Sequence, residues 1–266
     1  MALVPFPGAQ PDPYRLPPDE DDELQGGKMS FLEHLDELRK RIVYSVSAVG
    51  VGILIAFTFI NRIYSFLMAP TMRQLPPGSR LMYTEPGEAF SLYIQLSLIV
   101  GVLIVSPFIM YQLWLFIAPG LYSNEKRLAI PFVLLSTLGF VGGAVFNHYI
   151  MFPWMMAFFA SFNTQDLLFM PKLDAVFSLY TKFLLAMAAV FQMPTLVFFL
   201  AKMKLVTARF LASQFKYAVL LIFIISAVIT PTGDPVTQTV FAAPMVGLYV
   251  LGIAIAWLVG PKKLGD

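Results

Sequence analysis

Six apolar stretches constrain this chain more than any other feature of its sequence. They are Ile42–Ile60, Phe90–Met110, Leu128–Ile150, Ala175–Leu200, Tyr217–Thr230 and Val240–Val259. Each is close to the roughly 20 residues with which a helix crosses about 30 Å of hydrocarbon. Only 13% of the residues are charged, whereas a soluble domain carries roughly 25%. The sequence therefore predicts an all-α integral membrane protein with six transmembrane helices.

The fifth stretch, Tyr217–Thr230, is short, since a helix of that length spans only about 21 Å. Such a mismatch predicts a locally thinned bilayer, or fifth-helix and sixth-helix ends that neighbouring helices hold in place. The prediction of a short helix extends to the sixth helix as an alternative. Prolines within or beside several spans predict bent helices; they are Pro107, Pro131, Pro194 and Pro244.

The distribution of lysine and arginine predicts the orientation in the membrane. With the N-terminus inside, most of the 18 cationic residues fall on the cytoplasmic side, and few fall outside: Arg62, Arg73, Arg80 and Lys172. Cytoplasmic loops carry the excess of lysine and arginine. We therefore expect both chain termini in the cytoplasm.

The predicted membrane domain covers residues 29–261, with a short cytoplasmic tail at 262–266. Residues 1–28 differ from it in composition, because they are rich in proline and contain the acidic run Asp19–Glu23. Such a segment cannot form a core, and it lacks the pattern of a signal peptide or transit peptide. We expect a disordered cytoplasmic tail there.

Few residues of the sequence could support catalysis. Cysteine is absent, which excludes disulfides and thiolate chemistry. The two histidines, His34 and His148, fall on opposite sides of the membrane in the predicted topology, so they cannot share a metal or haem. The sequence has no phosphate-binding loop, zinc-protease motif or nucleophile elbow. We expect no enzyme, no cofactor and no metal site.

Carboxylates on the cytoplasmic side are the most informative polar groups. Ser30–Arg41 reads as an amphipathic helix that begins with a capping box and carries Glu33 and Glu37 one turn apart. Glu125 lies in the second cytoplasmic connection. These carboxylates suit an arginine-rich ligand, because a guanidinium pairs bidentately with a carboxylate. The alternative is a solvated surface in which basic neighbours balance Glu125 and Arg39–Arg41 anchor the helix at the headgroups.

Two polar residues fall within the fourth apolar stretch. Gln192 needs a partner inside the bundle or on another protein, and it could simply hold two helices together. Lys182 could extend its amine toward the interface. The span contains no pair of buried carboxylates that could relay protons or hold a cation.

Several short motifs in one order resemble the TatC family of twin-arginine translocase subunits. The matching segments are His34–Arg41, Ala69–Pro70, Ser106–Arg127, Phe152–Pro153, Phe191–Pro194 and Thr230–Gln238. The first reads H-L-x-E-L-R-x-R, and the third includes Y-Q-x-W-x-F-x-A-P. The resemblance covers nearly the whole chain from Ser30 to about Pro261.

The resemblance implies a receptor for the twin-arginine signal peptides of folded precursor proteins, in a proton-gradient-driven complex of the bacterial inner membrane. It also implies a cupped bundle, TatA-like and TatB-like single-span partners and several copies of this chain. Signal-peptide binding is implied for Glu37, Glu125, Phe116 and Arg39. Gln192 and Thr230 correspond to partner-subunit contacts, and Pro70 and Asp234 to external positions tied to assembly.

Other functions remain as alternatives. A small-solute secondary transporter would need a midplane site in repeated, broken helices, and the sequence has neither repeats nor converging charges. A membrane enzyme lacks a nucleophile and its base. A purely structural scaffold would not need carboxylates on the cytoplasmic face.

Overall fold

The computed structural model describes residues 31–75, 81–118, 128–164, 169–230 and 234–260. The chain divides into two compact units, residues 1–40 and 41–266. The predicted tail 1–28, the cap at Ser30 and the short tail 262–266 lie outside the described residues. In the described part the fold is helical, with no strand beyond one isolated bridge between Met82 and Lys172.

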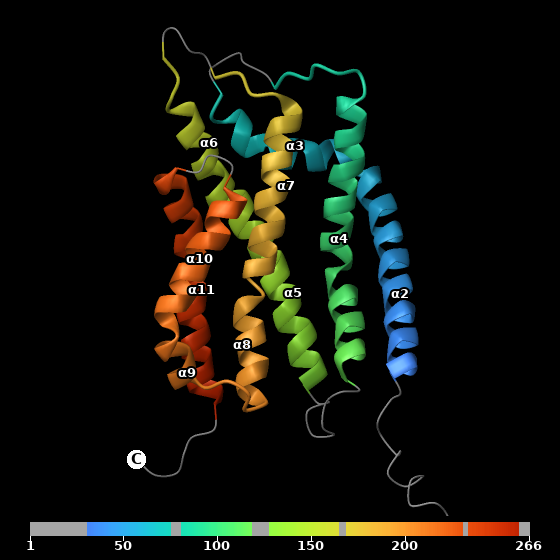
Figure 1. Ribbon diagram of the computed structural model, residues 1–266. Helices are drawn as coiled ribbons and strands as arrows, with labels where there is room; N and C mark the ends of the chain where they lie inside the picture. The colour runs from blue at the N-terminus through green and yellow to red at the C-terminus, as the bar shows by residue number, and fades with distance from the viewer. Residues whose placement is uncertain (1–30, 76–80, 119–127, 165–168, 231–233, 261–266) are drawn as a thin grey trace, which may run out of the picture. The chain divides into compact units, whose positions relative to one another are not determined.

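The helices follow one another in a simple order (Figure 1). They are α2 (Phe31–Thr58), α3 (Ile60–Met72), α4 (Glu88–Ile117), α5 (Ala129–Phe146), α6 (Phe152–Ala160), α7 (Leu173–Val190), α8 (Met193–Lys202), α9 (Ala208–Ser213), α10 (Phe215–Ile229) and α11 (Pro235–Val259). A π-helical turn, Asn147–Met151, joins α5 to α6. The prediction of an all-α membrane protein is confirmed.

Five helical segments in the described residues are long and apolar enough to cross a membrane. They are Leu32–Thr58, Glu88–Ile117, Ala129–Ala160, Leu173–Lys202 and Pro235–Val259. The predicted fifth span corresponds to α10, which has only 15 residues. Six spans therefore stay a prediction, and α10 is the short helix that the sequence indicates. The sixth apolar stretch is not short, because α11 has 25 residues.

Two segments between the predicted spans are partly helical. The first, 61–89, contains most of α3, which crosses the end of the neighbouring helices instead of running beside them (Figure 1). The other, 151–174, contains α6, because the third span continues as helix through the π-helical turn. Pro70 lies inside α3, and Pro153 lies in the first turn of α6.

The prolines affect the spans differently. Pro194 lies in the first turn of α8, directly after the break that separates α7 from α8. A proline is tolerated there because the first N–H groups of a helix have no intrahelical acceptor. Pro131 likewise lies in the first turn of α5. Pro107 and Pro244 lie inside helices that continue past them.

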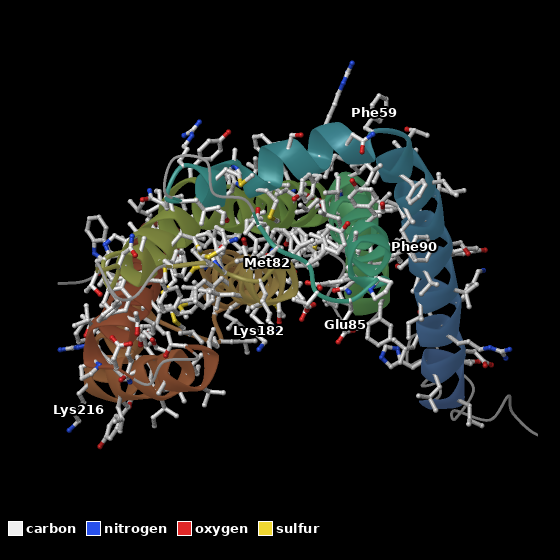
Figure 2. The ribbon with its side chains drawn as sticks, turned by 90° about the horizontal axis from the view of Figure 1, so that it is seen from above. Phe59, Met82, Glu85, Phe90, Lys182 and Lys216 are labelled. Atoms are coloured by element: carbon white, nitrogen blue, oxygen red, sulfur yellow. The ribbon has the colours of Figure 1, made fainter. Side chains whose placement is uncertain are left out.

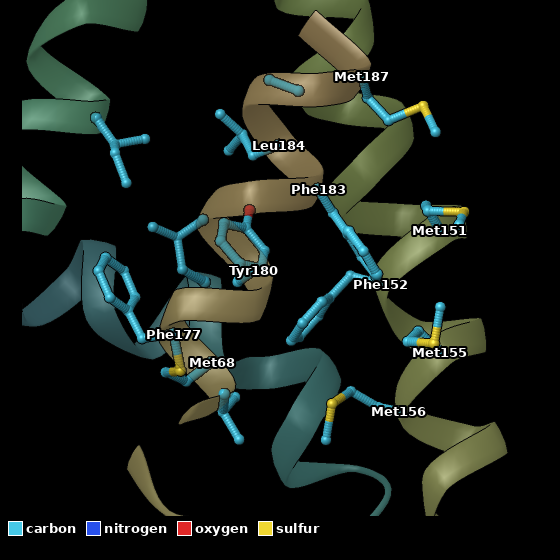
Figure 3. Packing of buried hydrophobic residues seen from close by; sticks show 14 of the residues in the cluster. Met68, Met151, Phe152, Met155, Met156, Phe177, Tyr180, Phe183, Leu184 and Met187 are labelled. Atoms are coloured by element: carbon cyan, nitrogen blue, oxygen red, sulfur yellow. The ribbon is translucent and has the colours of Figure 1, made fainter. Parts of the chain in front are cut away.

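The main hydrophobic core collects buried side chains from α3, α4, the π-helical turn, α6, α7, α10 and α11 and is rich in methionine and phenylalanine (part of it is shown in Figure 3). Phe152 packs edge-on against Tyr180, with ring centroids 4.8 Å apart. Met151, Met155 and Met187 are also fully buried. Methionine is unbranched and polarisable, so it adapts well to packing around aromatic rings.

Close backbone contacts at glycines join the long helices. A Cβ at Gly101 of α4 would lie 2.7 Å from the backbone nitrogen of Ile53 in α2, and one at Gly52 would lie 2.6 Å from the Gly101 carbonyl oxygen. Gly143 of α5 approaches the backbone of Met187 and Ala188 in α7 equally closely. Small residues allow such contacts, which drive association where lipid competes with apolar side chains.

We expect Gly101→Ala to destabilise the protein by about 1–3 kcal/mol, because the added methyl group forces α2 and α4 apart. Gly247→Ala is the matched control, since a Cβ there meets no heavy atom within 4 Å. Thermal unfolding of both variants in the same detergent measures the difference. Equal melting temperatures for the two variants would show that the α2–α4 contact does not stabilise the fold.

Candidate functional site

The predicted site residues fall on two different parts of the chain. Glu37 and Arg39 belong to the N-terminal unit, where Glu37 is half-buried and Arg39 is exposed. Phe116 is half-buried in the last turn of α4. Glu125 lies outside the described residues. The convergence of Glu37 and Glu125 on one ligand therefore remains a prediction.

A polar contact joins α2 to α4 within the larger unit. The guanidinium of Arg41 donates a hydrogen bond of 3.2 Å to the side-chain oxygen of Gln112. Gln112 is buried, with 5% of its surface exposed, and a buried amide needs such a partner. It lies four residues before Phe116, so the two side chains share one face of α4.

An aromatic cluster fixes the end of α4 against α5 and α8. The ring centroid of Trp114 lies 5.1 Å from that of Phe132 and 6.0 Å from that of Phe199, and the last two are 5.1 Å apart. Ala118 and Leu128 both pack against this cluster. These two residues flank 119–127, so both ends of the segment that contains Glu125 are anchored at one place.

Gln192 lies at the break between α7 and α8 and is half-buried. Its side-chain amide donates a 2.9 Å hydrogen bond to the carbonyl oxygen of Ser136 in α5. A Cβ on Gly139 would meet the Phe191 carbonyl oxygen at 2.8 Å, so α5 approaches the break closely. Gln192 thus has a hydrogen-bond partner within this chain, Ser136, as the alternative role of holding two helices together requires. Its contact with a partner subunit stays a prediction.

Thr230 and Asp234 flank the connection between α10 and α11. The Thr230 hydroxyl donates to the Ser226 carbonyl oxygen at 2.8 Å. Asp234 is the N-cap of α11, where its carboxylate accepts from the Thr237 backbone N–H at 2.8 Å and from the Thr237 hydroxyl. Both residues therefore have structural roles at helix ends. Their predicted roles in partner contact and assembly are separate from these bonds and remain predictions.

Lys182 and Pro70 have different surroundings. Lys182 is exposed on α7 and projects away from the buried core (Figure 2). Its exposure agrees with the interpretation that the amine extends toward an interface. Pro70 is buried in α3 and lines a cavity beside His148.

Glu88 is a structural residue that the sequence analysis missed. Its carboxylate accepts hydrogen bonds from the backbone N–H groups of Thr84 at 2.8 Å, Glu85 at 3.4 Å and Asp174 at 2.8 Å. Lys172, the N-cap of α7, provides no capping side chain. Glu88 therefore supplies the missing acceptor from α4, and its negative charge suits the N-terminus of α7.

We expect Glu88→Gln to loosen the start of α7, because a neutral amide is a weaker acceptor and offers only one oxygen. Hydrogen–deuterium exchange should become faster for the amides of residues 172–176 and 82–85. Glu85→Gln is the control, because Glu85 takes part through its backbone. Unchanged exchange in Glu88→Gln, or equal acceleration in the control, would contradict this role.

These features describe a multi-pass helical membrane protein with an anchored polar site at one end of α4. Residues 33–244 match the family described as Sec-independent protein translocase protein (TatC). The protein is therefore a component of a Sec-independent protein translocase, and this family is not a family of enzymes. The chain belongs to the TatC family.

Relatives from several bacteria support this assignment. The TatC protein of Koribacter versatilis is 41% identical over 240 residues, which cover 88% of each chain. That of Desulforapulum autotrophicum is 40% identical over 239 residues, covering 90% of this chain and 88% of the relative. A crystal structure of the twin-arginine translocase receptor TatC superposes with a TM-score of 0.73 at 38% identity, covering 85% of this chain and 99% of the other.

Proposed function

We propose that this chain is the signal-peptide receptor of a twin-arginine translocation complex. Glu37 and Glu125 bind the two adjacent arginines of the signal peptide, while Phe116 and Arg39 complete the recognition site. Both chain termini lie in the cytoplasm of a bacterial cell whose inner membrane holds the protein. Transport of the folded precursor draws on the proton gradient.

The hydrogen bond between Arg41 and Gln112 is the observation that carries this proposal. It joins the helix that contains Glu37 to the helix that ends beside Phe116. Glu37 precedes Arg41 by one helical turn in the sequence. The Trp114 cluster supports the same conclusion for Glu125, because it anchors both ends of segment 119–127.

The chemistry of the two carboxylates suits an arginine pair. Each carboxylate can accept two parallel N–H bonds from a guanidinium, whereas a lysine amine acts as a point charge. Two carboxylates supplied by separate segments can each take one arginine. A peptide with paired lysines would retain the charge and lose the bidentate geometry.

Partner subunits complete the proposed complex. TatA-like and TatB-like single-span subunits dock at the half-buried Gln192 and near Thr230, and Pro70 and Asp234 contribute to assembly on the outer side. Several copies of this chain share the complex. The break between α7 and α8 supports a docking position there, because it interrupts a span beside a polar side chain.

We expect Glu37→Gln and Glu125→Gln each to weaken binding of a twin-arginine peptide by about 10- to 100-fold, since a hydrogen bond to a charged group contributes roughly 1.5–3 kcal/mol. Fluorescence anisotropy with the purified chain in lipid nanodiscs measures the dissociation constant. A twin-lysine peptide should bind the wild-type chain more weakly. Added salt should also weaken binding, because exposed charges are screened within about 10 Å.

Asp36→Asn is the matched control, because Asp36 is an exposed carboxylate next to Glu37. It should leave binding nearly unchanged. Equal weakening by Asp36→Asn would indicate a general attraction to acidic surface. Full binding by both glutamine variants would overturn the proposed site. Thermal unfolding of each variant separates loss of binding from loss of fold.

A further inference from the structure

A polar pocket lies where α3 meets the π-helical turn. Figure 1 shows α3 at the end of the bundle where α4 begins, whereas Trp114 lies near the other end of α4. The volume of the pocket is about 260 Å³. Residues with hydrogen-bonding or cationic groups line it together with apolar ones: Phe66, Pro70, Arg73, Gln74, His148 and Tyr149. Neither the family assignment nor the proposed peptide site uses this pocket.

His148 is held in one orientation at the pocket. Its ring stacks on Phe66, with centroids 4.3 Å apart, and its Nδ1 lies 3.3 Å from the Tyr180 hydroxyl. Only 6% of the residue is exposed. With the hydroxyl donating to Nδ1, the ring carries its hydrogen on Nε2, the other ring nitrogen.

Arg73 supplies the charge of this pocket. It follows α3 directly and is exposed. No carboxylate of the described residues pairs with its guanidinium. A guanidinium and an imidazole thus line one small cavity, which suits the oxygens of a phosphate group.

An apolar groove continues from the pocket and shares Phe66, His148 and Tyr149 with it. Its volume is about 280 Å³. Side chains of α4 and α5 form its walls, among them Val100, Leu103, Ile104, Val141 and Val145. Val145 and Ile104 are about half exposed, at 49% and 47%, so the groove opens toward the surrounding lipid.

We propose that the pocket and the groove together bind one anionic phospholipid, with its phosphate at Arg73 and His148 and an acyl chain along α4 and α5. The adjoining polar and apolar regions match the two parts of such a molecule. Together they reach the size range of small-ligand sites, roughly 300–1,000 Å³. In the proposed topology this lipid comes from the outer leaflet.

Native mass spectrometry of the full chain, released from detergent after incubation with defined lipids, tests the proposal. Phosphatidylglycerol should be retained about fivefold more than phosphatidylcholine with the same acyl chains, as one basic residue near an anionic headgroup provides. Arg73→Gln should abolish this preference. Arg62→Gln removes the same charge from α3 outside the pocket and should preserve it.

The acyl-chain groove has its own test. Val145→Trp should fill the groove and lower retention of both lipids. Val250→Trp is the matched control, because Val250 is equally exposed, at 49%, on α11. Glycerol 3-phosphate, which has the phosphate without the chains, should not displace the lipid at millimolar concentration.

Four results would overturn the proposal. The first is an unchanged lipid preference in Arg73→Gln, and the second is an equal loss in Arg62→Gln. The third is displacement of the lipid by glycerol 3-phosphate, which would reduce the site to one for small anions. Loss of retention in both tryptophan variants would likewise assign the lipid to the general surface.

Discussion

Close contact between helix backbones is the constraint on which the rest of this structure depends. Lipid tails compete with apolar side chains, so helices in a bilayer associate mainly where small residues permit tight packing. Gly52 and Gly101 provide that contact between α2 and α4, and Gly143 provides it between α5 and α7. Since α4 carries Gln112, its position against α2 decides whether the hydrogen bond from Arg41 to Gln112 can form.

The two ends of α4 have different polar roles. At one end, Gln112 accepts a hydrogen bond from Arg41 and Trp114 packs in an aromatic cluster with Phe132 and Phe199. At the other end, Glu88 caps α7 and joins two segments that are 86 positions apart. The packing of α4 within the bundle therefore positions polar contacts at both of its ends. The proposed lipid pocket lies on the same side as Glu88.

Five of the six predicted spans correspond to helices long and apolar enough to cross a membrane, because long apolar runs leave a membrane-crossing chain few alternatives to helix. The sequence predicted Glu37 and Glu125 through motifs, without their geometry. It did not predict α3, because most of this helix lies between two of the apolar stretches. The contacts of Gln112 and Glu88 were also not predicted. Their partners are 71 and 86 positions away in the sequence, and local periodicity gives no information about pairs so far apart.

The distance between Glu37 and Glu125 tests the central claim most directly, and the absence of native cysteine makes it measurable. Glu37→Cys and Glu125→Cys in one chain would be treated with a bismaleimide reagent of about 10 Å, a span that two arginines on adjacent residues could bridge. The proposed site predicts an intramolecular crosslink between the two cysteines, because it requires both side chains to face one ligand. Absence of the crosslink, with each single cysteine still reactive, would contradict a shared carboxylate site.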